Sequence, residues 1–192
     1  MSLTNSTMLE LGTSIPTFEL PEVVSGKMIY PEIYAEKKGM LVMFICQHCP
    51  YVVHVREELA QLGHDYDLAE LEIIAISSND AKSYPDDAPE SLKHMAEQSG
   101  FVFSLCYDES QDVAKRFTAA CTPDFFLFNH SQTLVYRGQL DDSRPGNGKP
   151  VTGKDLRTAI ESMLSGQPVN ATQLPSAGCN IKWKSGNEPE YA

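Results

Sequence analysis

Two cysteines separated by two residues, Cys46 and Cys49, are the residues whose types and spacing most clearly predict chemistry. They follow the apolar run 41–45 and precede Pro50, after which a helical pattern begins. Two thiols at the junction of a buried strand and a helix can form and break a disulfide, because a helix N-terminus favours the nucleophilic thiolate. The pair therefore predicts thiol–disulfide exchange.

The same spacing predicts an order of roles. Cys46 ends the strand and is expected to be the more accessible sulfur, so it is assigned the attack on a substrate disulfide. Cys49, expected in the first helical turn, would resolve the mixed disulfide. His48 lies between them, and an imidazolium there would stabilise a neighbouring thiolate. The alternative for His48 is a spacer that faces solvent.

Two other interpretations of the cysteine pair are half of a zinc site and a pair of unreactive core thiols. A four-ligand zinc site usually shows a second CxxC or a close pair of histidines, and neither occurs here. Cys106, Cys121 and Cys179 have no spacing that supports such a site. We therefore expect no metal and no organic cofactor, and the cysteine pair is itself the predicted redox element. A metal-binding module remains the less favoured alternative.

Composition narrows the class of protein further. The chain has 26 acidic residues against 15 Lys and Arg, a net charge of −11, which disfavours nucleic acid and anionic membranes as partners. Its five cysteines are odd in number and widely spaced, unlike a secreted disulfide framework. No apolar run approaches the length of a transmembrane helix, and residues 1–8 do not resemble a signal peptide. These features favour a cytoplasmic protein.

The elements that must position the cysteines alternate between strands and helices. Apolar and β-branched runs predict strands at 41–45, 71–76, 101–105, 124–128 and 134–136. Helical spacing of apolar residues predicts helices from Pro50 to about residue 66 and at 91–99, 111–119 and 154–164. This alternation predicts an α/β fold in which helices flank both faces of a central mixed sheet that has an antiparallel edge.

The length of the chain suggests one domain with extensions. Residues 1–10 are expected to form a flexible N-terminus, and a small N-terminal hairpin is predicted around the Ser25–Gly26 turn. The domain itself is expected to span residues 11–166. Residues 167–192 lack strong periodicity and are expected to form a C-terminal tail packed on the domain.

The dithiol segment, together with the later run 122–128, resembles the thioredoxin superfamily. This resemblance implies a thioredoxin-like fold, in which Pro123 is a cis-proline that faces the dithiol and exposes the Thr122 backbone to a substrate strand. A turn proline that starts a strand is the alternative. Asp80 resembles the acidic residue that extracytoplasmic thiol–disulfide oxidoreductases place near the dithiol, where it could relay a proton. A turn-capping role is the alternative for Asp80.

A closer resemblance is to the peroxiredoxin-like proteins of the alkyl hydroperoxide reductase/thiol-specific antioxidant group. It spans residues 11–184 and is carried by the segments 49–52, 121–128, 136–145 and 178–184. A peroxiredoxin needs Pro-x-x-x-Thr/Ser-x-x-Cys and a separate arginine. When Cys49 is aligned to that motif, Cys46 stands in place of the hydroxyl residue and Val42 in place of the proline. Thr122 and Pro123 occupy the region where the arginine is expected.

The broken peroxide-binding motif makes disulfide exchange the leading hypothesis for function and thiol peroxidase the alternative. The expected partners are a disulfide-containing protein or small molecule and a thiol that donates electrons. Cys121 lies two residues before Pro123, so it could take part in redox chemistry or be a small buried apolar residue. Cys179 could be a second resolving thiol or a packing residue.

Overall fold

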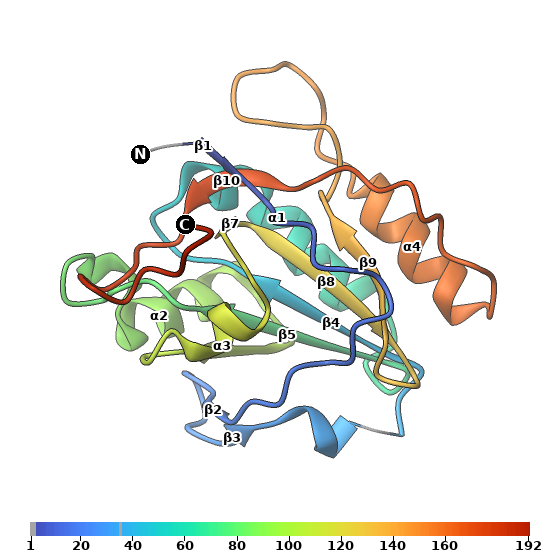
Figure 1. The fold of residues 1–192 in the computed structure, drawn as a ribbon, viewed down its shortest axis with the longest axis horizontal. Helices are drawn as coiled ribbons and strands as arrows, with labels where there is room; N and C mark the ends of the chain where they lie inside the picture. Colours follow the sequence, from blue (N-terminus) through green and yellow to red (C-terminus); the bar gives the residue numbers. More distant parts are fainter. Residues whose placement is uncertain (1–2, 35) are drawn as a thin grey trace.

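A five-stranded mixed sheet forms the centre of the computed structural model, which describes residues 3–34 and 36–192 (Figure 1). Its strand order is β6-β5-β4-β8-β9, in which β4, β5 and β6 are parallel and β8 and β9 are antiparallel to their neighbours. The strands span Gly39–Phe44 (β4), Leu71–Ser77 (β5), Ser104–Tyr107 (β6), Asp124–Asn129 (β8) and Leu134–Gly138 (β9). The predicted mixed sheet with an antiparallel edge is confirmed.

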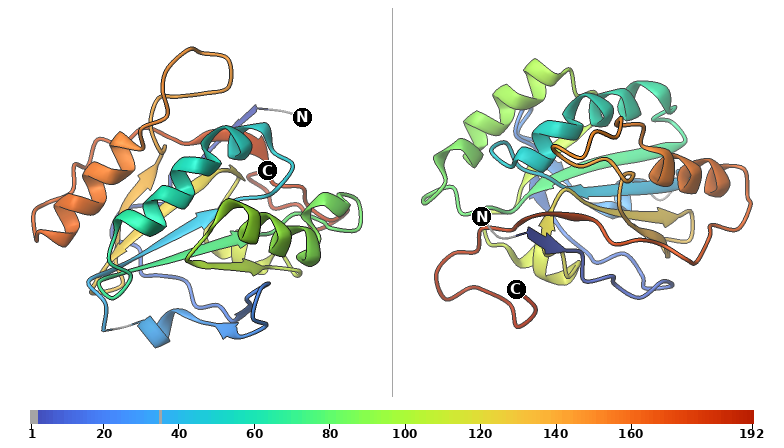
Figure 2. Two further views of the ribbon diagram at one scale, coloured as in Figure 1. Left: turned by 180° about the vertical axis from the view of Figure 1, so that it is seen from behind. Right: turned by 90° about the horizontal axis from the view of Figure 1, so that it is seen from above.

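Three helices cover one face of this sheet (Figure 2). They are α1 (Pro50–Asp65), α2 (Pro89–Ser99) and α4 (Lys154–Leu164). Every residue of β4 is buried, because the side chains of Leu41 and Met43 pack under these helices while those of Val42 and Phe44 pack on the opposite face. An uninterrupted apolar run is typical of a strand that is buried on both faces.

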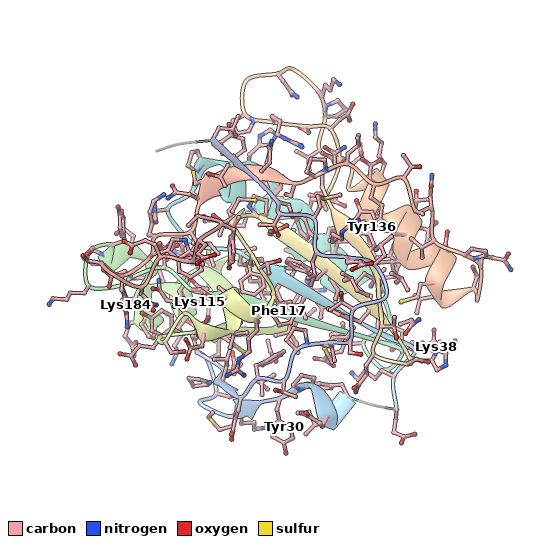
Figure 3. The ribbon with its side chains drawn as sticks, in the orientation of Figure 1. Tyr30, Lys38, Lys115, Phe117, Tyr136 and Lys184 are labelled. Atoms are coloured by element: carbon pink, nitrogen blue, oxygen red, sulfur yellow. The ribbon has the colours of Figure 1, made fainter. Side chains whose placement is uncertain are left out.

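The opposite face is covered by the short helix α3 (Asp112–Arg116) and the N-terminal part of the chain (Figure 2). Phe117, labelled in Figure 3, follows α3 and lies at the centre of this layer. Its ring centroid lies 5.4 Å from that of Phe44 and 5.5 Å from that of Phe126, both in edge-on geometry. Such aromatic pairs stabilise a core beyond the area that they bury.

Two smaller sheets complete the fold. The predicted N-terminal hairpin is present as β2 (Leu20–Pro21) and β3 (Met28–Ile29). The other sheet has the order β1-β10-β7, and its three strands span Leu3–Asn5 (β1), Ala177–Asn180 (β10) and Cys121–Thr122 (β7). It therefore joins the two ends of the chain to the segment that precedes Pro123 (Figure 1).

Several predicted boundaries were wrong. The strand expected at 101–105 begins only at Ser104, because Phe101 and Phe103 stack on each other in an irregular segment. The helix expected at 111–119 is reduced to α3, since the chain turns at Thr118, whose φ is 50°. The sequence predicted no regular element before residue 11, yet Leu3–Asn5 forms β1. Met1 and Ser2, also part of that expected flexible segment, lie outside the described residues.

Candidate active site

The two predicted redox cysteines lie where β4 meets α1. Cys46 follows β4 closely, and Cys49 is the N-cap residue of α1, with Pro50 in the first helical position. The exposed fraction is 1% for Cys46 and 0% for Cys49. Both residues therefore lie beneath other parts of the chain, and the prediction that Cys46 is the more accessible of the two sulfurs stays a prediction.

Thr122 contacts both sulfurs. The Cys46 Sγ lies 3.3 Å from the Thr122 hydroxyl oxygen, and the Cys49 thiol lies 3.2 Å from the Thr122 carbonyl oxygen. The peptide bond between Thr122 and Pro123 is cis, as the resemblance to thioredoxins implied. The structure thus brings together four of the predicted site residues, Cys46, Cys49, Thr122 and Pro123.

The pKa values of the two thiols are shifted in opposite directions. A hydrogen bond from the Cys46 side chain, followed by others that include Cys179, Thr122 and the Val52 backbone, lowers the pKa of Cys49 to about 4 against the opposing effect of burial. The bond to Cys49, burial and the charge of Asp87 raise the pKa of Cys46 well above its usual value.

These shifts favour the thiolate form at Cys49 over that at Cys46. The predicted order of roles assumed that Cys46 would adjoin the helix N-terminus. Because α1 begins at Pro50, Cys49 is the residue that lies at the helix N-terminus, and the Val52 backbone contributes to lowering its pKa.

Asp87 is a buried carboxylate that sequence reasoning missed. Its Oδ1 accepts a hydrogen bond from the Gln47 backbone N–H at 2.7 Å, and its Oδ2 accepts one from the Asn79 side-chain amide at 2.7 Å. The same Oδ2 lies 2.5 Å from Nδ1 of His48, whose ring stacks on Tyr84 at a centroid distance of 5.4 Å. Asp87 therefore holds the loop between the two cysteines. It lies in the polar stretch 85–89, and no local pattern there signals a buried acid.

The Asp80 side chain makes its hydrogen bonds within its own turn. Its Oδ1 accepts a hydrogen bond from the Lys82 backbone, and its Oδ2 accepts one from the Ser83 hydroxyl at 2.6 Å. These contacts cap a local turn, which was the alternative for this residue. The carboxylate beside the cysteine loop is that of Asp87.

The remaining three cysteines have different surroundings. Burial raises the pKa of Cys106, which packs on the far face of the sheet. Burial also raises the pKa of Cys121, and its thiol lies 3.7 Å from the Pro123 carbonyl oxygen that accepts its hydrogen bond. Burial, followed by a hydrogen bond to Cys49, raises the pKa of Cys179 to about 12. Cys179 is therefore hydrogen-bonded to a member of the pair, whereas the pair affects Cys121 only through the charge of Cys49.

Cys46, His48 and Asp87 each offer a possible metal-ligating atom, and the three atoms lie within 4.8 Å of one another. The oxygens of Asp87 are already engaged by Gln47, His48 and Asn79. Within this group His48 and Asp87 contact each other, whereas the Cys46 sulfur contacts the Thr122 hydroxyl.

Asp124 is a second buried carboxylate that the sequence did not single out. It follows Pro123 and is fully buried, and burial raises its pKa to about 7, although hydrogen bonds from Ser6 and two backbone groups oppose this. Its Oδ2 has no hydrogen-bond partner among the described residues. An unpartnered buried carboxylate destabilises the folded state when it is ionised.

We expect Asp124→Asn to increase stability in mild alkali and to flatten its dependence on pH. Because the pKa of Asp124 is raised from 3.8 to about 7, the stability linked to it is fully present below pH 3.8 and is lost as pH rises through about 7. Urea unfolding from about pH 5 to about pH 8 would measure this loss in the natural chain and its absence in the variant. Asp112→Asn, on an exposed residue, is the control. Parallel profiles for all three chains would contradict the prediction.

The fold is thioredoxin-like, and it places the cysteine pair beside a cis-proline. The profile of the AhpC/TSA family matches residues 11–137, which is most of the chain, and the chain belongs to this family. Among curated proteins, none matches the chain. No helix of the described residues is both long and apolar enough to cross a membrane.

Two solved structures are similar over nearly the whole length. An uncharacterised conserved protein from Geobacillus kaustophilus is 48% identical, with a TM-score of 0.93 over 96% of this chain and 97% of the other. A hypothetical protein from Sinorhizobium meliloti 1021 is 45% identical, with a TM-score of 0.93 over 95% of this chain and 100% of the other. The thioredoxin domain of a thiol-disulfide oxidoreductase from Bacteroides vulgatus is 17% identical, with a TM-score of 0.63 over 81% of this chain and 99% of the other, a likeness of fold alone.

Proposed function

We propose that this protein is a thiol–disulfide oxidoreductase in which Cys49 attacks and Cys46 resolves. The observation that carries the proposal is the position of Thr122, beside a cis-proline and in contact with both sulfurs. That arrangement holds two thiols within hydrogen-bonding reach of each other and lowers the pKa of one. A low-pKa thiol beside a second thiol is the requirement for disulfide exchange at neutral pH.

The chemistry has two exchange steps. The Cys49 thiolate attacks one sulfur of a substrate disulfide, a Cys49–substrate disulfide forms, and the other substrate sulfur leaves as a thiolate. Cys46 gives its proton to that leaving thiolate, attacks the Cys49 Sγ and releases the second substrate sulfur. The substrate disulfide gains two electrons and the cysteine pair loses two. An external thiol then returns the pair to its reduced form.

The other residues of the site act by position. The contacts of Asp87 with Gln47 and His48 hold the loop that joins the two cysteines. Thr122 contacts the sulfurs directly, so it would orient them for exchange. The expected substrate is a disulfide in a protein or a small molecule, and the expected electron donor is a thiol. The burial of Cys49 requires a local opening before a substrate can reach it.

Thiol peroxidase is the second candidate, and the lowered pKa of Cys49 at the N-terminus of α1 favours it. A peroxidase also needs an arginine close to its nucleophile. The Arg56 Nη2 donates to the Gln47 carbonyl at 3.0 Å, and the Arg137 guanidinium donates to Gln173 and to Met8. Neither set of contacts supports a peroxide beside Cys49, so disulfide exchange is the function that we propose.

Reduction of insulin disulfides and consumption of hydrogen peroxide, measured on one preparation with one thiol donor, test the proposal. We expect insulin reduction to exceed the uncatalysed thiol reaction, and peroxide to be consumed no faster than by a Cys49→Ser variant. Rapid peroxide turnover that persists in Cys46→Ser, without insulin reduction, would instead establish the peroxidase. Cys106→Ser is the matched control, because it removes a buried thiol from the other face of the sheet.

A further inference from the structure

The strand β10 lies along the edge of β7 (Figure 1). β7 is the strand that directly precedes the cis-proline, Pro123. The two strands pair antiparallel, and Cys179 stands opposite Thr122. A Cβ atom at Gly178 would overlap the Thr122 carbonyl group, so glycine is the residue that permits this close approach. On its other edge β10 pairs with β1, where Leu3 stands opposite Cys179. The position of Cys179 is therefore fixed by strands on both sides.

Thr122 brings three thiols into one cluster. It contacts the sulfurs of Cys46 and Cys49, and it faces Cys179 across the strand pair. The side chain of Cys179 also forms a hydrogen bond with that of Cys49. All three residues belong to the same buried core cluster. Cys49 thus lies within reach of two different thiols, Cys46 in the same loop and Cys179 in the C-terminal part of the chain.

We propose that Cys179 is a third exchange thiol, which resolves mixed disulfides by forming a Cys49–Cys179 disulfide. This inference rests on the proposed function and deepens it. After Cys49 has formed a mixed disulfide, Cys179 gives its proton to the departed substrate thiolate and attacks the Cys49 Sγ. The S–S bond to the substrate breaks, the second substrate sulfur leaves as a thiolate, and Cys49 and Cys179 together lose two electrons. Cys46 stays reduced.

Burial is the largest cause of the raised pKa of Cys179, and reaction of Cys49 removes two of the smaller ones, the bond to Cys49 and its charge. The charge of Cys49 contributes to raising the pKa of Cys179, and that charge disappears when Cys49 enters a disulfide. The positive charge of Lys182 acts on Cys179 in the opposite direction and lowers its pKa. The bond to Cys49, which is the largest cause of the raised pKa of Cys46, is lost in the same step, but burial and the charge of Asp87 still raise that pKa. Two resolving routes therefore compete for the same Cys49 sulfur.

A stoichiometric reaction of the Cys46→Ser chain with dithionitrobenzoate tests the proposal. We expect one equivalent of thionitrobenzoate when Cys49 reacts, and a second equivalent when Cys179 displaces the adduct. Intact mass should then show no adduct, and a peptide map should show Cys49 linked to Cys179. In Cys46→Ser/Cys179→Ser the adduct should persist on Cys49, with its release slowed at least about tenfold, whereas Cys46→Ser/Cys106→Ser should behave like Cys46→Ser.

A Cys46→Ser chain that keeps its adduct on Cys49, with a free Cys179, would overturn the proposal. A peptide map of the natural chain after mild oxidation by diamide gives a readout that needs no substitution. The Cys49–Cys179 link should appear there beside the Cys46–Cys49 link, and its absence would also overturn the proposal. A Cys49–Cys179 disulfide in a chain that does not reduce insulin would remove the proposed function and leave this inference standing. Insulin reduction without that link would overturn this inference and leave the proposed function standing.

Discussion

Cys49→Ser should abolish disulfide reduction, with a loss of about three orders of magnitude or more, because serine cannot supply a thiolate at neutral pH. Insulin reduction under a fixed concentration of thiol donor measures the effect. Cys46→Ser should lose less activity, since the attacking thiolate is retained. Cys106→Ser should retain the natural rate. The reverse ranking, with Cys46→Ser inactive and Cys49→Ser accumulating mixed disulfides, would restore the order of roles predicted from the sequence.

The assignment of Cys49 as the attacking thiol also predicts how its reactivity depends on pH. Since the pKa of Cys49 is lowered to about 4, its thiolate is already formed at pH 7. Alkylation of Cys49 by iodoacetamide should therefore keep a constant rate from neutral pH down to about pH 5 and fall to half near pH 4. The hydrogen bond from Cys46 is the largest cause of the shift, so Cys46→Ala should move this midpoint upward. A midpoint near the ordinary cysteine value in the natural chain would contradict the assignment.

The largest loss of stability is expected from Asp87→Ala. The carboxylate of Asp87 is fully buried and accepts hydrogen bonds from Gln47, His48 and Asn79. Its removal leaves the buried Asn79 amide and two half-buried donors without an acceptor, which we expect to cost about 3–5 kcal/mol. Urea unfolding at neutral pH measures the change.

Two variants keep this prediction specific. Asp87→Asn retains an acceptor oxygen and should lose less stability than Asp87→Ala. Asp86→Ala removes the adjacent, exposed carboxylate and should change stability by less than about 0.5 kcal/mol. Similar losses for Asp86→Ala and Asp87→Ala would show that the loop, and not the buried carboxylate, is responsible.

The architecture could be predicted from the sequence because its signals are local. The apolar run 41–45 indicated a strand buried on both faces, and the helical spacing after Pro50 located α1. Helix α4 was predicted at its observed bounds, 154–164. Such patterns depend on neighbours a few residues apart, so they survive folding unchanged. Strand β1 was missed because its three residues acquire a partner only when the far end of the chain folds back.

The candidate site was predicted in part for the same reason. Cys46 and Cys49 are adjacent in sequence, and the resemblance supplied Thr122 and Pro123. The role of Asp87 could not be predicted from the sequence, because its burial depends on contacts with the cysteine loop and with Asn79. Asn79 lies just beyond the C-terminal end of β5. Asp80 was chosen for its resemblance to an acidic residue of extracytoplasmic thiol–disulfide oxidoreductases, but its oxygens accept hydrogen bonds within its own turn.

The sheet β1-β10-β7 has a consequence for how a newly made chain completes its site. β10 is synthesised after all other described strands, whereas Cys46 and Cys49 emerge early. Cys46 and Cys49 are therefore both present in the growing chain for an interval before Cys179 is added. During that interval Cys49 can pair with Cys46 but has no Cys179 within reach. A nascent chain can therefore form only the Cys46–Cys49 disulfide of the two. The two resolving thiols compete for Cys49 only after β10 has paired with β7.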